Sequence, residues 1–494
     1  MAERIVVAAD LGASGGKMAR GSFDGRTLKV GDFFDFPNQP VDLNRDLYWD
    51  LFGLYKSILS GLKRYGAETE VEAVSIDSWG ATYGLLDNKG RLLEPVYHYR
   101  DLRTEYTMEK MYQVISKRKL FELTGCQPAR SYTLPQLYSY VEHEEKILEL
   151  ADMLLFLPDL LAYFLTGEAA VERSIAGTSG LLLPDQSGWS MEVFGILGIP
   201  TGILRPLSEA GTERGVVRRS AADSLGIRQA KVIAAPSHDT ASAIVGIPHF
   251  DTEQVYISIG TNINMGVEIL KHDASEKAFL GGFKNAAVME GRKILYRDFA
   301  ACWLLNEFRR TCGEHGVFYS YQEMMELAEE SCPQGVFVDV EDDKLNNSGG
   351  DMKEKINAYL KSTGQRTLAE DGDFIRCILE SIALKVKYCT EYLEKELNIP
   401  VRRVSAVNGG IRNHVLMQMF SDTLKRPVYC GLPYATLTGN VLTQLYALSE
   451  LGAVEEIRDL SGRSFEMKEY LPKKERAEYW DTALCKMREK GVCK

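Results

Sequence analysis

Residues 8–19 read AADLGASGGKMA, and they place one acid, Asp10, and a glycine-rich turn directly after the apolar run of residues 5–9. Two common nucleotide-binding loops do not fit this spacing, because GxxxxGK(S/T) needs one more residue before its Gly-Lys pair and GxGxxG is absent. Both loops also lead into a helix, whereas the residues that follow here favour a strand and reach a hairpin signal at Asp24-Gly25. The sequence therefore predicts that the turn after Asp10 joins two strands.

The composition is typical of a globular enzyme with two or three domains. The chain has 494 residues, of which 45% are apolar and 26% charged. Its longest apolar stretch, residues 153–165, is interrupted by Pro158 and Asp159 and is shorter than the roughly 18 residues of a membrane span. The apolar run at the start is too short for a signal peptide. We therefore expect a cytoplasmic protein without a membrane segment.

Cysteine usage and net charge limit the kinds of site and of binding partner that we expect for this chain. The nine cysteines are scattered without a C-x-x-C pair, which favours reduced thiols over a disulfide framework or a zinc site. A formal charge of −11 argues against a nucleic-acid partner. It does not exclude an anionic nucleotide in a local pocket.

Extended and helical patterns alternate along the chain. Four short segments rich in valine and isoleucine have the pattern of buried strands, at residues 71–77, 230–236, 253–260 and 402–410. Amphipathic stretches long enough for helices lie between them, for example at residues 54–66 and 374–397. The sequence predicts a mixed α/β fold.

The opening pattern recurs near the middle of the chain, where VYISIGTNI (residues 255–263) resembles VVAADLGAS (residues 6–14). Each stretch predicts a hairpin whose turn offers backbone N–H groups, and such groups can bind phosphate oxygens. The alternative for either turn alone is a tight turn that needs glycine at positive φ. Two such turns could face each other across a cleft.

Two further segments join a strand to a helix. In residues 231–247, KVIAAPSHDTASAIVGI, Asp239 lies where a strand ends and a helix begins, so it either complements the helix dipole or acts as a general base for a sugar hydroxyl. In residues 405–428 a strand is followed by Gly409-Gly410 and an amphipathic helix. Glycines there would let a flat base or ribose approach the backbone.

The ordered motifs of this chain resemble those of the FGGY carbohydrate kinases, and within that family those of the rhamnulokinases. The motifs are DLGAS at Asp10, IDSWG at Asp77, PVYHYRDLRT at residues 95–104, LPD and AYFLTG within residues 157–167, SHDTASA at Ser237, and NGGIRNHVLMQMFSDTLKRPV at Asn408. They span nearly the whole chain, and six motifs in the same order are far more specific than any one of them.

The resemblance implies two actin-like, ribonuclease H-like α/β domains, residues 1–246 and 247–494, with ATP and sugar in the cleft between them. The last helix, from about Lys473, could pack on either half. The implied activity is Mg²⁺-requiring, ATP-dependent phosphorylation of a ketose hydroxyl, and L-rhamnulose is the sugar that the resemblance favours most. The enzyme would be a monomer or a homodimer. Alternatives are another ketose or polyol such as L-fuculose or a pentulose, a non-catalytic sugar-binding protein that kept the fold, and an ATPase of the wider actin-like superfamily.

The resemblance also implies roles for individual residues. Asp10 would hold Mg²⁺ through water, and Asp239 would be the general base. The residues expected to bind ATP are Gly12, Ala13, Ser14, Gly15, Gly16, Lys17, Gly260, Thr261, Asn306, Gly409 and Gly410. The residues expected to bind the sugar are Asp77, Trp79, Gly80, His238, Thr240 and Asp298. Trp79 could equally be a core residue.

Some positions depart from the rhamnulokinase pattern. Where rhamnulokinases typically have the motif W-G-V-D-F, this chain has Trp79-Gly80-Ala81-Thr82-Tyr83. The hydroxyl of Thr82 therefore replaces a carboxylate that is expected to face the sugar. Asp298 replaces an asparagine and Asn306 a glutamine, and the second hairpin lacks an aromatic residue after Gly260-Thr261. Exchanging an acceptor-only carboxylate for a hydroxyl changes which sugar hydroxyls can be satisfied, so the kinase prediction is firmer than the substrate prediction.

Overall fold

The computed structural model describes residues 3–300, 302–347 and 349–492, which form two compact units. Unit 1 contains the described residues of Met1–Phe250, Ile269–Leu295 and Tyr434–Phe465. Unit 2 contains those of Asp251–Glu268, Tyr296–Pro433 and Glu466–Lys494. The chain enters unit 2 just after the predicted boundary at residues 246 and 247, and two later segments belong to unit 1 again. A division into two continuous domains stays a prediction.

Unit 1 is built on a six-stranded sheet with the order β11-β12-β6-β1-β2-β3. These strands are Glu213–Val216 (β11), Lys231–Ile233 (β12), Ala73–Ser78 (β6), Arg4–Gly12 (β1), Gly15–Phe23 (β2) and Leu28–Pro37 (β3). Strand β1 pairs with β2 antiparallel and with β6 parallel, and β12 also runs parallel to β6. The carboxyl ends of β1, β6 and β12 therefore lie at one edge of the sheet.

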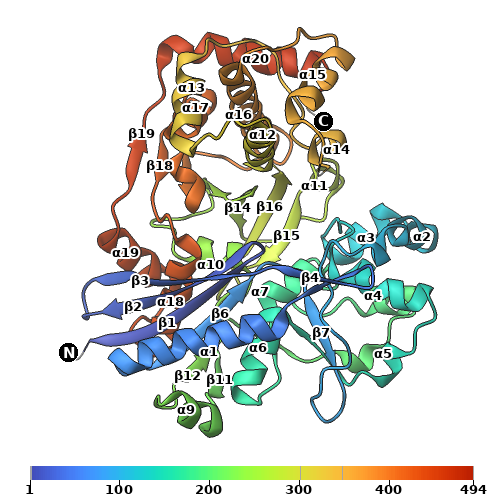
Figure 1. Ribbon diagram of the computed structural model, residues 1–494, viewed down its shortest axis with the longest axis vertical. Helices are drawn as coiled ribbons and strands as arrows, with labels where there is room; N and C mark the ends of the chain where they lie inside the picture. Colours follow the sequence, from blue (N-terminus) through green and yellow to red (C-terminus); the bar gives the residue numbers. More distant parts are fainter. Residues whose placement is uncertain (1–2, 301, 348, 493–494) are drawn as a thin grey trace. The chain divides into compact units, whose positions relative to one another are not determined.

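Helices cover both faces of this sheet (Figure 1). Helix α1 (Leu51–Glu68) buries Leu54, Ile58 and Leu62, which recur at helical spacing, and contacts β1 and β2. Helix α18 (Ala435–Ala447) contacts β1, β2 and β6 and packs on α10 (Asp239–Val245). On β2, Met18 reaches α1 and Gly21 faces Val441 of α18. Because strand residues three apart point to opposite faces, α1 and α18 lie on opposite sides.

Smaller elements complete unit 1. Helix α6 (Leu157–Thr166) packs against β6, β7, β8 and β11, where β7 (Tyr83–Leu86) and β8 (Met153–Phe156) form an antiparallel pair. Strand β4 (Pro40–Leu43) pairs with β5 (Asp46–Trp49), and β9 (Val171–Glu172) pairs with β10 (Leu207–Ser208). The short helix α7 (Arg173–Ala176) follows β9 directly. Figure 1 shows α6 beside β6, which it contacts.

A second sheet has seven strands in the order β15-β16-β14-β13-β17-β18-β19, where β15 is Lys284–Ala287. Its last six strands, on which unit 2 is built, repeat the arrangement of unit 1. The strands are Lys293–Ala300 (β16), Asn262–Ile269 (β14), Gln254–Ile259 (β13), Arg403–Val407 (β17), Val428–Cys430 (β18) and Lys468–Tyr470 (β19). Strand β13 pairs with β14 antiparallel and with β17 parallel. Both stretches predicted to be repeated hairpins are confirmed, since each is a hairpin whose first strand has a parallel neighbour.

Helices pack around the long helix α16 (Asp371–Lys395) of unit 2, as Figure 1 shows. Its neighbours are α12 (Cys302–Glu314), α13 (Tyr321–Glu330), α17 (His414–Leu424) and α20 (Ala477–Glu489). The last helix, α20, contacts α16 and α17 and buries Trp480. It therefore packs within the C-terminal half, one of the two positions left open by the sequence.

Two general features concern the described residues as a whole. None of their helices is both long and apolar enough to cross a membrane. Their eight cysteines, Cys126 to Cys485, form no disulfide with one another, and Cys493 lies outside the described residues.

Candidate active site

The predicted sugar and metal residues of unit 1 gather at the carboxyl edge of its sheet. Asp10 on β1 lies directly opposite Asp77 on β6 in the parallel register. Beyond the end of β6, the Ser78 amide donates to the Ser237 carbonyl at 2.9 Å, and Ser78 forms a parallel bridge with His238. The segment that carries Asp239 therefore extends the sheet beside β6. In this way the fold brings together residues that are 67 or more positions apart in sequence.

The turn after β1 has an open tip. Gly12 pairs with Gly15 across the hairpin, and Ala13 and Ser14 between them are exposed. A Cβ on Gly12 would lie 2.7 Å from the Gly15 carbonyl oxygen, so this close approach requires glycine. Lys17 lies opposite Asp10 on β2, forms an ion pair with Asp35 and lines an open hollow with Ser14, Gly15 and Gly16. The turn thus presents exposed backbone and one lysine, as an anion site requires.

Asp77 is fully buried and receives a hydrogen bond at 2.6 Å from the amide of Asn440 on α18. The Gln444 amide in turn donates to Asn440 Oδ1 at 2.9 Å and to the Val7 carbonyl at 2.9 Å. Burial, followed by repulsion from Asp10, raises the pKa of Asp77 well above its usual value. Its buried position thus favours the neutral form of the Asp77 carboxyl next to Asp10.

Burial and the nearby charge of Asp239 raise the pKa of Asp10 to about 7, against the opposing effects of Asp77 and Lys17. The Asp10 residue as a whole is half-buried. Its carboxyl nevertheless lies deep enough that loss of hydration is the largest cause of its raised pKa. Asp10, Asp77 and Asp239 bring three carboxyls to one edge of the sheet, and such a site gains from a divalent cation. The described residues contain no group of three or more side chains arranged to ligate a metal directly. This donor set fits Mg²⁺ held through water, since Mg²⁺ keeps several of its waters.

Asp239 is the first residue of α10, and the contacts that its carboxylate makes with other described residues are at Oδ1. Oδ1 accepts from the Thr240 amide at 2.5 Å and from the Thr240 hydroxyl at 3.1 Å. His238 Nε2 lies 3.3 Å from the same oxygen. The side chain of Asp239 retains 35% exposure. A half-exposed carboxylate oriented through one oxygen can accept a proton from a bound hydroxyl through the other.

The residues around Trp79 are packed more tightly than a sugar-facing loop requires. Trp79 is 7% exposed, stacks on Trp49 with ring centroids 4.2 Å apart, and donates from Nε1 to the Thr82 hydroxyl at 2.7 Å. Thr82 is 1% exposed, so its hydroxyl serves the indole. Gly80 adjoins Thr178, whose hydroxyl accepts from the Ala81 amide at 2.9 Å. Direct sugar contacts by Trp79 and Gly80 stay predictions.

In unit 2 the predicted nucleotide residues gather at the matching edge of the second sheet. Gly260 and Thr261 are exposed at the β13–β14 turn, and the Trp303 amide donates to the Thr261 carbonyl at 2.9 Å. Ser258 lies opposite Val407 in the parallel register, and the Asn408 amide group donates to the Ser258 hydroxyl at 3.0 Å.

The two glycines at this edge of unit 2 differ in how closely they are packed. A Cβ on Gly410 would lie 2.1 Å from Ile259 Cγ2, whereas one on Gly409 would meet nothing within 4 Å. The predicted set Gly260, Thr261, Gly409 and Gly410 is thus brought together at the ends of β13 and β17.

Asn306 lies on α12, where its Oδ1 accepts from the Tyr321 hydroxyl at 2.8 Å. It lines an open hollow of unit 2 with Arg309, Gly313, Phe318 and Tyr321. Phe318 is 82% exposed, so an apolar ring is available there to a flat ligand. Asp298, predicted as a sugar ligand, is a half-buried residue of β16 in unit 2.

Sequence reasoning did not identify Asn440, although this residue satisfies the buried Asp77. One signal was present: Asn440 and Gln444 are four residues apart in a helix whose other residues are apolar or small, so both lie on one face. A pair of amides in such a helix indicates a buried polar partner.

Comparisons with known proteins show which family the chain resembles. Models of the FGGY family of carbohydrate kinases match the chain, the N-terminal domain over residues 44–246 and the C-terminal domain over residues 255–448. A rhamnulokinase of Bacteroides thetaiotaomicron is 32% identical over 477 residues, which cover 96% of this chain and 97% of that protein. A rhamnulokinase of Bacillus subtilis is 29% identical over 470 residues, covering 95% and 96%.

Solved structures with low sequence identity share the fold. Ligand-bound xylulose kinase from Lactobacillus acidophilus matches with a TM-score of 0.81 at 14% identity, over 98% of both chains. Plasmodium falciparum glycerol kinase with ADP matches with a TM-score of 0.80 at 14% identity, over 99% of both chains. These likenesses confirm the predicted α/β fold of the actin-like class.

Proposed function

Because the chain belongs to the FGGY family of carbohydrate kinases and is therefore an ATP-dependent sugar kinase, we propose that it phosphorylates the 1-hydroxyl of L-rhamnulose, a 6-deoxy-ketohexose. The observation that carries this proposal is the similarity to rhamnulokinases over nearly the whole chain, at 32% identity in one case. The cluster of Asp10, Asp77 and Asp239 at one sheet edge supplies groups suited to the chemistry.

Asp239 is the proposed general base. The 1-hydroxyl oxygen forms a bond to the γ-phosphorus of ATP, the bond from that phosphorus to the β,γ-bridging oxygen breaks, and ADP leaves. The hydroxyl proton goes to the Asp239 carboxylate, whose orientation is supported by the Thr240 amide and hydroxyl. His238 and Thr240 lie beside it as proposed sugar ligands, with Asp77, Trp79, Gly80 and Asp298 as the others.

Mg²⁺ would neutralise charge on the transferring phosphates, with Asp10 holding it through water. On unit 1, the proposed phosphate contacts are the backbone of the β1–β2 turn and the Lys17 ammonium. Lys17 pairs with Asp35 and lies 5.3 Å from the Phe33 ring centroid, contacts that keep it near the turn. On unit 2, the proposed ATP contacts are Gly260, Thr261, Asn306, Gly409 and Gly410.

A second substrate within the same class has support from Thr82. Its hydroxyl is committed to Trp79, so the carboxylate that rhamnulokinases are expected to have at this position has no counterpart here. Loss of one acceptor would suit a ketose with a different arrangement of hydroxyls, such as L-fuculose or a pentulose.

The proposal is tested by measuring ADP release over a panel of ketoses, aldoses and polyols, with ATP and Mg²⁺ constant. We expect L-rhamnulose to give the highest kcat/KM of the panel. Equal or higher kcat/KM for L-fuculose or a pentulose would overturn the choice of sugar. No stimulation by any ketose would overturn the ketose proposal itself.

A further inference from the structure

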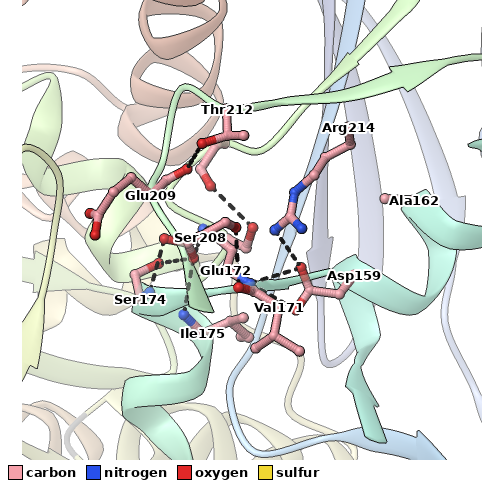
Figure 2. A network of polar contacts seen from close by, with 12 residues as sticks. Asp159, Ala162, Val171, Glu172, Ser174, Ile175, Ser208, Glu209, Thr212 and Arg214 are labelled. Atoms are coloured by element: carbon pink, nitrogen blue, oxygen red, sulfur yellow. Dashed lines mark hydrogen bonds and ion pairs between the residues drawn. The ribbon is translucent and has the colours of Figure 1, made fainter. Parts of the chain in front are cut away.

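A buried carboxylate that the proposed chemistry does not use lies behind the segment that carries Asp239. Glu172 is the last residue of β9, is fully buried, and precedes α7. Its carboxylate accepts from the Ser174 amide at 2.9 Å, the Ile175 amide at 3.1 Å and the Ser174 hydroxyl at 2.6 Å. Figure 2 shows Glu172 between Ser174 and Ile175 on one side and Asp159 on the other.

The same carboxylate reaches the Asp239 segment through its backbone. The Ser237 amide donates to Glu172 Oε2 at 2.9 Å, and the His238 amide donates to the Ser174 hydroxyl at 3.2 Å. The Ser237 carbonyl, on the other side, accepts from the Ser78 amide at 2.9 Å. Ser237 is therefore held between Glu172 and the end of β6, one peptide before His238 and two before Asp239.

Glu172 is itself anchored by a second buried pair. Its backbone amide donates to the Asp159 carboxylate at 3.1 Å, and Arg214 Nη2 donates to the same carboxylate at 3.2 Å. Asp159 and Arg214 are 4% and 6% exposed. Figure 2 shows this order, from Arg214 through Asp159 to Glu172.

Capping of α7 does not account for this arrangement. A cap needs an oxygen for one or two amides at the helix start, and a serine or aspartate near the surface provides that. Burying an ionised carboxylate is costly unless it is fully hydrogen-bonded. The contact with the Ser237 amide lies outside the helix that Glu172 caps, so the carboxylate joins two segments that are 65 residues apart.

We propose that Glu172 is a positioning residue for phosphoryl transfer, which holds the Ser237–His238 backbone, directly and through Ser174, so that Asp239 meets the sugar hydroxyl. This inference rests on the proposed role of Asp239 as general base. Glu172 touches neither substrate, and its effect passes through the backbone. Small displacements of a base from its reacting partner reduce turnover strongly, because the reaction depends on alignment.

The first test is Glu172→Gln, which preserves size but turns one oxygen into an NH₂ group that faces amide donors. We expect kcat to fall about 10-fold to 100-fold with the sugar KM nearly unchanged. In an Asp239→Asn background the same change should produce no further fall, because the base that it positions is absent. A full multiplicative fall in the double variant, or a normal kcat in Glu172→Gln, would overturn the inference.

A matched pair of serines tests the same point with less disturbance. Ser174→Ala removes the acceptor of the His238 amide, whereas Ser208→Ala removes a hydroxyl from the same network that donates only to the Val171 carbonyl, at 3.1 Å. We expect kcat to fall about threefold to tenfold in Ser174→Ala and to stay normal in Ser208→Ala. Equal kcat values in the two variants would overturn the inference. Normal turnover in Asp239→Asn alone would instead overturn the proposed general base.

Discussion

Near their carboxyl ends, strands β1 and β6 of unit 1 carry the paired residues Asp10 and Asp77. The corresponding pair on strands β13 and β17 of unit 2 is Ser258 and Val407, and Asn408 follows Val407. The two edges have the same topology, a hairpin whose first strand has a parallel neighbour. In unit 1 the groups suited to chemistry are carboxyls, among them the buried Asp77, which accepts from Asn440, and the half-exposed Asp239, which accepts from Thr240. In unit 2 they are exposed backbone groups and one side-chain amide.

This difference has a physical consequence for how each edge tolerates change. Buried acids depend on hydrogen-bond partners and on protonation, because an unsatisfied or wrongly charged group is costly away from water. Binding at exposed backbone depends on free space around the N–H groups, because a ligand must be able to reach them. Substitution of an acid should therefore affect unit 1 chemically, and an added methyl group should affect unit 2 sterically.

The largest effect is expected for Asp239→Asn in unit 1. The amide nearly preserves shape but cannot accept the hydroxyl proton, so kcat should fall about 10²-fold to 10⁴-fold while sugar affinity is largely retained. Steady-state kinetics and calorimetric sugar binding check this. Asp223→Asn, which changes an exposed acid of helix α9 (Arg219–Leu225), is the control and should behave as wild type. Turnover near normal in Asp239→Asn would remove the base from the mechanism.

The next effect is expected for Asp10→Asn. Loss of a negative charge that holds Mg²⁺ through water should lower activity about 10-fold to 100-fold at fixed Mg²⁺ and raise the Mg²⁺ concentration needed for half-maximal rate. A Mg²⁺ titration of kcat measures both. An unchanged Mg²⁺ midpoint in the variant would contradict the assignment of Asp10 to the metal side.

The pH dependence of stability gives a further test of the buried groups of unit 1, at His98. Burial lowers its pKa to about 4, its ring stacks on Trp49 with centroids 4.0 Å apart, and its Nδ1 accepts from the Arg100 amide at 3.0 Å. Because the unfolded chain binds a proton at His98 near pH 6.5 and the folded protein does not until about pH 4, stability falls as pH drops through this window. The loss from His98 should be about 2 kcal/mol at pH 5 relative to pH 8.

Urea unfolding of wild type and His98→Asn at both pH values isolates this contribution. Asparagine can still accept from the Arg100 amide but does not titrate, so the variant should lose less stability on acidification than wild type. Identical losses in the two proteins would show that His98 is charged in the folded state at pH 5.

The smallest effect concerns unit 2. Gly410→Ala places a Cβ 2.1 Å from Ile259 Cγ2, so the end of β13 must shift, and the KM for ATP should rise about tenfold with little change in the sugar KM. Gly188→Ala in unit 1 is the control, since Gly188 lies outside the proposed ATP contacts and its added Cβ would have no described neighbour within 4 Å. Equal ATP KM values for the two alanine variants would show that this edge does not take part in ATP binding.

Much of the framework could be predicted from local sequence. The hairpin after Asp10 followed from residues that favour a strand beyond the glycines, and the start of α10 at Asp239 followed from the end of an apolar run at Pro236. These features depend on neighbours in the chain, so periodicity and turn chemistry were sufficient. The order of the motifs then indicated the family.

The supporting partners could not be predicted, because they come from far away in the sequence. Asn440 meets Asp77 across 363 residues, and Glu172 ends a strand of two residues that has no periodicity to detect. The hydroxyl of Thr82 was expected to face sugar, but it accepts from Trp79, a choice made by packing. Residues 434–465 belong to unit 1 although they follow most of unit 2 in the sequence. Only long-range contacts determine this assignment, so local sequence patterns could not predict it.

The central claim, transfer of phosphate to the 1-hydroxyl of L-rhamnulose, is tested most directly by proton-coupled ³¹P NMR of the wild-type reaction with ATP and this sugar. A 6-deoxy-ketohexose has its only primary hydroxyl at carbon 1, so a phosphate ester there couples to two methylene protons. The account predicts a new monoester triplet that grows as ATP is converted to ADP. A doublet, which marks a secondary hydroxyl, or ADP formation without any sugar phosphate would contradict it.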